Sequence, residues 1–298
     1  MKHWKPAVIA ALWSGALYAA PMPVVASFSI LGDVAQQIGG ERVAVQSLVG
    51  ANQDAHAYNL TSSDIKKIRE ARLVLLNGLG LEKAELQRAV KQSKVASAEA
   101  TAGIKPLTAD EHHHEHGHDH DHDHGEFDPH VWNDPVLMQR YAANVAIALI
   151  KADPAGSRYY QQRFKDYQNV LNQLNNYANQ QFGAVAPAKR KVLTGHDSFA
   201  YLGKRYQVKF ISPQGVSSEA EPSARQITAI IRQIKAENVK AVFTENIKDG
   251  RMIARIAKET GVKVSGGLYA DALSSGAPAG TYADMFRYNV RVMSEAMK

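Results

Sequence analysis

The histidines of this chain include three isolated residues that lie far apart in the sequence. The chain holds twelve histidines in 298 residues and no cysteine. Apart from His3 and one dense cluster, only His56, His130 and His196 remain. Neutral imidazole is the commonest metal ligand among protein side chains, and a chain without cysteine has no thiolate site. These three histidines are therefore the first candidates for a metal site.

Each isolated histidine lies where a β-strand is expected to end. His56 follows the apolar run Val43–Val49, and His196 follows the run 191–194 directly after Gly195. In open α/β sheets, ligand sites form beyond the carboxyl ends of the strands. Since the histidines come from two halves of the chain, we expect them to converge on one cleft.

Asp271 is a fourth candidate, because it occupies the matching place after the predicted strand 262–264. Three neutral imidazoles and one carboxylate form a closed set of four ligands, which Zn²⁺ takes in tetrahedral geometry. Each half of the chain would supply two of them. Spacing alone leaves open that these are ordinary hydrogen-bonded side chains, since aspartate routinely caps helices and turns.

The elements that must position these residues alternate between strands and helices in both halves. Such alternation predicts an α/β fold with mostly parallel sheets in two lobes. In the second half, Ile227, Ile230, Ile231 and Ile234 have the spacing of a core-facing helix. The predicted strands are 24–30, Val43–Val49 and Leu73–Leu76 in the first half, and 191–194, 208–211, 241–243 and 262–264 in the second.

One long helix is predicted between the halves. Asp153 and Pro154 suit a helix start, and no proline follows until after Phe182. Apolar residues recur there at spacings of three and four, which places them on one stripe of a helix roughly 42 Å long. Such a helix would join the lobes stiffly. The stripe consists of Tyr160, Phe164, Tyr167, Leu171, Leu174 and Ala178.

The first twenty residues have the pattern of a secretory signal peptide. Lys2 and Lys5 precede a mostly apolar run, 7–20, that is short for a membrane span; an uncleaved anchor is the alternative. Export without a cysteine that could carry a lipid predicts a soluble periplasmic protein, which we expect to be a monomer. The predicted organisation is a signal peptide (1–20), an N-terminal metal-binding lobe (21–153), a linking helix (154–183) and a C-terminal metal-binding lobe (184–298).

The composition excludes several classes of protein. Hydrophobic residues make up 45% and charged residues 21% of the chain, as in ordinary globular proteins. The formal net charge is +6, to which the signal peptide contributes two lysines. The remaining charge is too small and too dispersed to indicate a nucleic-acid partner.

The dense cluster of histidines occupies residues 111–124, which hold eight histidines and five acidic residues. This composition predicts an exposed loop. The loop would bind zinc weakly, or accept it from a periplasmic zinc chaperone, unless its metal binding is adventitious. It also contains the letters of a zinc-protease motif, but that motif needs an amphipathic helix, and this segment is polar throughout. Its histidines are His112, His113, His114, His116, His118, His120, His122 and His124.

In the segments around the isolated histidines and Asp271, the chain resembles the zinc- and manganese-specific solute-binding proteins of ABC importers, the ZnuA/TroA type (cluster A-I). The resemblance spans the mature chain and implies two α/β lobes bridged by one long helix. It also implies that His56, His130, His196 and Asp271 ligate the metal, and that an inner-membrane permease and its ATPase are the partners. It is carried by the His56 loop, Asp128-Pro129-His130-Val131-Trp132, Gly195-His196-Asp197-Ser198-Phe199, Glu219-Ala220-Glu221-Pro222-Ser223 and Tyr269-Ala270-Asp271-Ala272-Leu273-Ser274.

The ligand types favour zinc as the cargo. Manganese-specific relatives typically have a carboxylate at the third position, where this chain has His196, and imidazole suits zinc better than manganese. With Asp271 as fourth ligand, the chain looks most like the AztC group of zinc-binding proteins. It lacks the C-terminal disulfide that is frequent in the ZnuA subgroup.

We therefore predict a periplasmic zinc-binding protein that delivers Zn²⁺ to an ABC importer and is not an enzyme. A zinc hydrolase is disfavoured because catalytic zinc keeps an open coordination position. A manganese-delivering homologue, and an extracytoplasmic zinc buffer or chaperone without a transporter, remain the alternatives.

Overall fold

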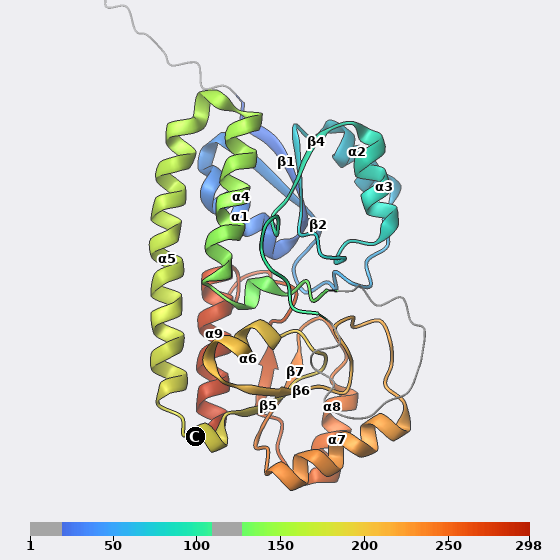
Figure 1. Cartoon of the computed structure of the whole chain (residues 1–298). Helices are drawn as coiled ribbons and strands as arrows, with labels where there is room; N and C mark the ends of the chain where they lie inside the picture. Colours follow the sequence, from blue (N-terminus) through green and yellow to red (C-terminus); the bar gives the residue numbers. More distant parts are fainter. Residues whose placement is uncertain (1–19, 109–126) are drawn as a thin grey trace, which may run out of the picture.

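Two four-stranded parallel sheets, one from each half of the chain, form the centres of two lobes (Figure 1). The computed structural model describes residues 20–108 and 127–298. The α/β fold predicted from the alternation of elements is confirmed. The predicted signal peptide, apart from Ala20, and the histidine-rich segment 111–124 lie outside the described residues. No helix in the described ranges has the length and apolar character needed to cross a membrane.

The sheet of the first lobe has the strand order β2-β1-β3-β4. Its strands are β1 (Met22–Phe28), β2 (Val43–Val49), β3 (Leu73–Leu76) and β4 (Ala96–Glu99). Its helices are α1 (Ser29–Gly39), α2 (Ser62–Glu70), α3 (Ala84–Ser93) and α4 (Leu137–Ala152), with 3₁₀ turns at Gly40–Arg42 and Val131–Asn133.

The first predicted strand, 24–30, is wrong at its end, because α1 already begins at Ser29. A continuous apolar run does not distinguish the end of a buried strand from the start of a buried helix. Gly32 lies inside α1, where a Cβ atom would collide with the Ser47 hydroxyl of β2. This glycine therefore permits the helix to pack closely on the strand.

The sheet of the second lobe repeats the same pattern in the order β6-β5-β7-β8. Its strands are β5 (Lys191–Leu193), β6 (Lys209–Ile211), β7 (Ala241–Glu245) and β8 (Gly266–Leu268). Its helices are α6 (Ala200–Tyr206), α7 (Ala224–Glu237), α8 (Arg251–Thr260) and α9 (Tyr282–Met297), with a 3₁₀ turn at Pro187–Lys189. The predicted isoleucine stripe of α7 packs against the apolar cluster on one face of this sheet.

The predicted strand 262–264 is wrong, since the edge strand β8 begins only at Gly266. Gly261 ends α8 in the left-handed conformation, with φ 74°, and the next four residues lead the chain back to the sheet. Val264 is 39% exposed on this path. Glycine has low strand propensity, so Gly266 and Gly267 conceal the real strand in the sequence.

The long helix between the halves is α5 (Ser157–Gly183), and it runs beside both lobes (Figure 1). A 3₁₀ turn, Pro154–Gly156, precedes it. Asp153 does not cap this start with its side chain, but accepts hydrogen bonds from Arg42 and from the Tyr160 hydroxyl. All of the predicted apolar stripe is buried except Phe164, which is half-buried. The final helix, α9, packs along α5, so a second helix also ties the lobes together.

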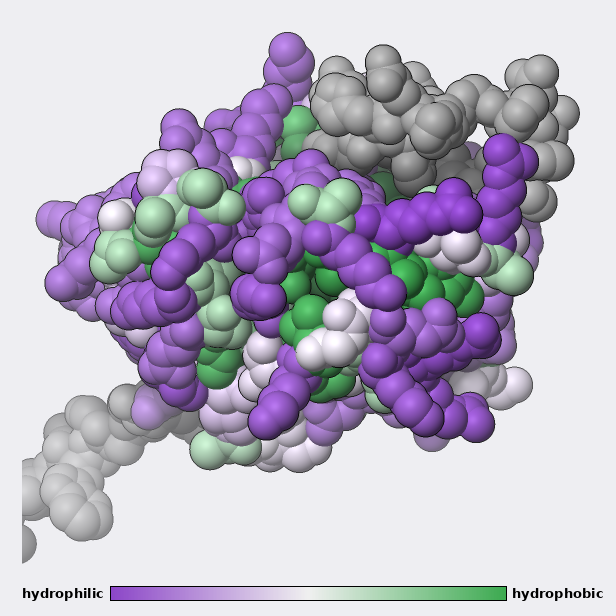
Figure 2. All heavy atoms as spheres, turned by 90° about the horizontal axis from the view of Figure 1, so that it is seen from below, coloured by the Kyte–Doolittle hydropathy of each residue, from purple (hydrophilic) through white to green (hydrophobic). Residues whose placement is uncertain are grey.

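The outer face of the second lobe is mainly hydrophilic, with apolar side chains confined to separate small areas (Figure 2). Among the described residues, the large hydrophobic side chains that are exposed are Val136, Ile147 and Val264. These three are scattered single residues, which are ordinary on a protein surface.

The first testable prediction concerns Asp64, which lies at the start of α2, just after the His56 loop. Asp64 forms a capping box with Thr61 and also accepts hydrogen bonds from Tyr58 and Lys67. Burial raises the pKa of Asp64, but these hydrogen bonds outweigh it and lower the pKa to about 2. An Asp64→Asn variant should lose about 1 to 2 kcal/mol of unfolding free energy at neutral pH.

Urea unfolding at several pH values measures this effect. Because the folded-state pKa is lowered, the stabilisation is present above the ordinary pKa of 3.8 and is lost as the pH falls towards 2. The stability difference between wild type and Asp64→Asn should therefore shrink over that range. A difference that does not depend on pH would exclude the ionised carboxylate as its source.

Candidate metal centre

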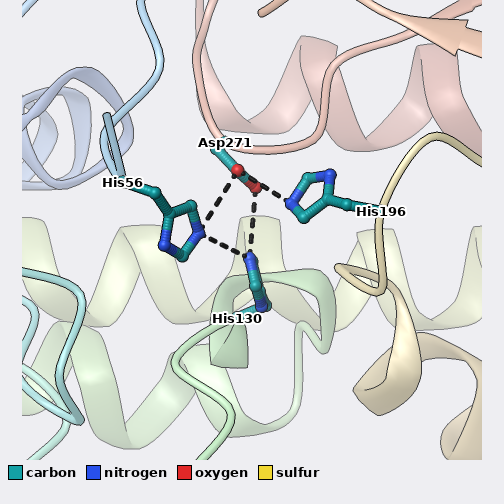
Figure 3. A group of neighbouring side chains, drawn as sticks. All are labelled: His56, His130, His196 and Asp271. Carbon is teal, nitrogen blue, oxygen red and sulfur yellow. Dashed lines mark hydrogen bonds and ion pairs between the residues drawn. The ribbon is translucent and has the colours of Figure 1, made fainter. Parts of the chain in front are cut away.

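The four residues singled out in the sequence come together between the lobes (Figure 3). His56 lies in the loop between β2 and α2, and His130 directly precedes the turn at Val131–Asn133. His196 follows β5, and Asp271 lies between β8 and α9. One ligand atom from each of the four residues lies within 4.8 Å of the others, and all four side chains are buried.

Four of the distances between these side chains are close to the edge length of a tetrahedral metal site. A tetrahedron with metal–ligand distances of about 2.0–2.1 Å has edges of about 3.3–3.4 Å. The Nε2 atoms of His56 and His130 are 3.2 Å apart. The Asp271 carboxylate oxygens lie 3.6 Å, 3.4 Å and 3.0 Å from the Nε2 atoms of His56, His130 and His196, respectively. All four distances lie close to the expected edge.

Within the described residues, the polar atoms at the centre have no hydrogen-bond partner outside the cluster. Both carboxylate oxygens of Asp271 and Nε2 of His196 are buried, and their contacts are with the other side chains of the cluster. Burial raises the pKa of Asp271, but the adjacent imidazoles, His196 foremost, outweigh it and hold the pKa below its usual range. Because unsatisfied buried polar atoms are costly, a bound cation would stabilise this arrangement.

Two of the three imidazoles have a buried carboxylate behind them. Nδ1 of His130 is 2.7 Å from Asp128 Oδ1, and Nδ1 of His196 is 2.6 Å from Glu245 Oε2. Such a carboxylate accepts the Nδ1 proton and leaves Nε2 free to face a metal. No corresponding carboxylate contact is found for His56 among the described residues.

Sequence reasoning missed the parts played by Asp128 and Glu245. Asp128 belongs to the motif around His130, but its role behind the ring is visible only in the structure. Glu245 ends the strand β7 and is only 5% exposed. An acidic residue at the end of a buried apolar run is the signal that could have found it.

The two imidazoles with the clearest pKa shifts move in opposite directions. Burial lowers the pKa of His56 to about 4, despite the nearby carboxylate of Asp271. Burial also acts to lower the pKa of His196, but Glu245 and Asp271 outweigh it and raise the pKa well above its usual value. Burial therefore favours the neutral form of His56, whereas the two carboxylates favour the protonated form of His196.

Trp132 connects the site to both lobes. Its ring centroid lies 5.0 Å from those of His130 and Phe28. Its indole N–H donates a 2.8 Å hydrogen bond to the carbonyl of Ala270, beside Asp271. A residue of the first lobe therefore fixes the position of the loop of the second lobe that carries Asp271.

The second testable prediction concerns Glu245, whose negative charge lies behind the His196 ring. In Glu245→Gln the amide can still occupy the space but accepts the imidazole proton less strongly. We expect metal affinity to fall about 10- to 100-fold, which is typical for loss of a residue that orients a ligand. Competition with a chelator of known affinity measures this loss. Glu259→Gln, an exposed change on α8 away from the interface between the lobes, is the matched control, and an equal loss in both variants would refute the role of Glu245.

The fold and the site together define a two-lobed metal-binding protein with its site between the lobes. The chain belongs to the ZnuA/TroA family of solute-binding proteins of metal ABC transporters. The family profile, described as "Zinc-uptake complex component A periplasmic", matches residues 24–296. The resemblance inferred from the sequence motifs is thus confirmed.

Individual relatives are named for different metals. The chain is 32% identical to the manganese-binding lipoprotein MntA of Bacillus subtilis (strain 168), over 93% of this chain and 90% of the relative. The periplasmic zinc-binding protein TroA from Treponema pallidum has a similar structure, with a TM-score of 0.85 and 26% identity over 94% of this chain and 99% of TroA. A manganese-bound periplasmic metal-binding protein from Candidatus Liberibacter asiaticus gives a TM-score of 0.78 and 28% identity, over 92% of this chain and 99% of that protein.

Proposed function

We propose that this protein captures one Zn²⁺ ion between its lobes in the periplasm and delivers it to an ABC importer. His56 and His130 of the lobe 21–153 and His196 and Asp271 of the lobe 184–298 would be the ligands. The observation that carries this proposal is the convergence of four buried ligand atoms, two from each lobe, within 4.8 Å of one another. Zinc prefers a closed tetrahedral set of this kind.

Zinc fits the ligand set better than manganese does. Manganese favours carboxylate, carbonyl and water oxygens in octahedral arrangements, whereas three of these four ligands are imidazoles. Delivery of manganese is the second candidate function, because the relative from Bacillus subtilis is named as manganese-binding. Both candidates use the same four residues.

Transport accounts for the site better than catalysis or storage does. Four protein ligands leave no open position for a reactive water, which a zinc hydrolase needs. Membership of a family of ABC transporter components favours delivery to a permease over simple buffering. The partners would be an inner-membrane permease with its ATPase. The histidine-rich segment 111–124 would be an accessory that collects zinc or accepts it from a chaperone.

Metal competition on the mature protein tests the identity of the cargo. We expect one tightly bound zinc per chain, and we expect that a large excess of Mn²⁺ does not displace it. The measurement combines elemental analysis of the isolated protein with titration in a zinc-buffered solution. Displacement of zinc by equimolar manganese would support the second candidate instead.

Metal binding should weaken as the pH falls, which is the third testable prediction. Protons and zinc compete for the same Nε2 atoms, and the raised pKa of His196 means that binding already releases a proton near neutrality. Affinity should fall by about tenfold per pH unit around pH 7, and more steeply below about pH 6 as other imidazoles gain protons. Titrations between pH 7.5 and 5.5 measure this dependence, and a flat profile would contradict histidine ligation.

A further inference from the structure

The contact between the lobes has a buried side around Trp132. Besides the bond from Trp132 to Ala270, the Tyr282 hydroxyl donates to the carbonyl of Trp132, and Tyr201 donates to that of Asp128. All three hydrogen bonds are buried. Separation of the lobes here would leave buried polar groups without partners and away from water. The interface around Trp132 is therefore costly to open.

The part of the interface at the His56 loop is polar and partly exposed. Ser218 of the second lobe donates a 2.5 Å hydrogen bond from its hydroxyl to Oδ2 of Asp54. Lys83 and Glu219 form a 2.8 Å ion pair, with side chains that are 28% and 50% exposed. Water can replace the exposed ion pair at little cost, and fewer buried groups are held here than around Trp132, so the lobes should separate here first.

Asp54 connects this side of the interface to the first ligand. While Oδ2 accepts from Ser218, Oδ1 accepts from the backbone N–H groups of His56 and Ala57, at 2.9 Å and 3.3 Å. One carboxylate therefore shapes the turn that carries His56 and also binds the other lobe. This matters because the His56 ring has no supporting carboxylate of its own among the described residues.

The second lobe holds Ser218 in a fixed position. Its side chain is fully buried, and its carbonyl accepts hydrogen bonds from Gln214 and Lys248. Gln214 in turn forms a parallel β-bridge with His196. Ser218 is therefore placed relative to a ligand of its own lobe before it reaches Asp54.

The His56 loop also has room to move. A pocket of about 280 Å³ in the first lobe lies against this loop, and its lining includes Val49, Ala55 and Tyr58. Asn52, at the start of the same loop, is bonded separately to Leu273 and Asn246 of the second lobe. Loss of the contact with Ser218 would therefore release the part of the loop around Asp54 and His56, which lies next to this space.

We propose that the Asp54–Ser218 hydrogen bond is a latch that holds His56 in its ligating position only while the lobes are together. This inference rests on the proposed function and specifies how release is controlled. A partner that draws residues 218–219 away from the His56 loop would loosen the first ligand and free the metal at that side. Asp54 and Ser218 are positioning residues in this scheme, because neither is a ligand.

Zinc release measured by stopped flow tests the latch. The mature protein, loaded with one equivalent of Zn²⁺, is mixed with an excess of a chromogenic chelator. Ser218→Ala should retain one bound zinc and an unchanged association rate, but should release zinc about tenfold faster, because it lacks one hydrogen bond to a charged group. Glu219→Gln should accelerate release about twofold, and only at low salt, since exposed ion pairs are weak and screened.

Ser217→Ala is the matched control, because within the described residues the Ser217 hydroxyl accepts a hydrogen bond only from the backbone N–H of Glu219 in its own loop. It should release zinc at the wild-type rate. If Ser218→Ala also releases zinc at the wild-type rate, the latch is refuted. Failure of the proposed function looks different: wild type would not retain one zinc, or His130→Ala would retain it as tightly as wild type.

A second comparison tests whether the latch acts through His56. In a His56→Ala background, adding Ser218→Ala should change zinc affinity by less than about twofold, because the ligand on which the latch acts is gone. If the serine variant weakens binding equally in both backgrounds, Ser218 acts on lobe contact in general, and the route through Asp54 and His56 is wrong.

Discussion

Replacement of His130 by alanine should lower zinc affinity by about a thousandfold. The His130 ring is fully buried, and Asp128 holds it with Nε2 towards the centre of the cluster. The free energy of binding at a four-ligand zinc site is about 10–16 kcal/mol, so the loss of one ligand removes about 3–4 kcal/mol. Competition with chelators of graded affinity measures this change directly.

Deletion of residues 111–124 is the comparison that distinguishes zinc binding between the lobes from zinc binding by the histidine-rich segment. The deletion variant should retain one tightly bound zinc, because its four proposed ligands are unchanged. His56→Ala provides a second test at the rim of the site, where that residue is 7% exposed and its loss disturbs the core less. If tight binding disappears with the histidine-rich segment while His130→Ala binds as wild type does, the site between the lobes is not the zinc site.

Replacement of Trp132 by alanine should cost about 3 to 5 kcal/mol of unfolding free energy, the largest effect on stability that we expect from a single change. The side chain is fully buried between Phe28 and His130, and it donates the hydrogen bond to Ala270. The variant would leave a large cavity and would also release the loop that carries Asp271. Urea unfolding of the metal-free protein, followed by far-UV circular dichroism, gives the change.

Trp132→Phe separates packing from hydrogen bonding at this position. It retains an aromatic ring between Phe28 and His130 but cannot donate to Ala270, so it should lose clearly less stability than the alanine variant. Trp132 is also the only tryptophan after residue 20. Its fluorescence in wild type should therefore change when zinc binds to the adjacent His130. If the alanine and phenylalanine variants lose the same stability, the packing argument is wrong.

The sequence by itself located all four residues that converge between the lobes. The three histidines stand out because they are isolated and lie near predicted strand ends, and both features are local properties of the chain. Asp271 could be placed by the same rule even though the strand before it was predicted at the wrong residues. The long helix α5 could also be predicted from the sequence, because its apolar residues repeat with the period of a helix.

Tertiary structure alone decided which groups support those ligands. Glu245 lies 49 residues from His196, Ala270 lies 138 residues from Trp132, and Ser218 lies 164 residues from Asp54. Contacts of this kind depend on how the two sheets and their loops pack, and no periodicity along the chain records them. The edge strand β8 was not predicted from the sequence for a related reason, since its pairing with β7 compensates for the low strand propensity of Gly266 and Gly267. The choice of the four candidate ligands therefore follows from local sequence, whereas the orientation of their side chains is set by contacts between distant segments.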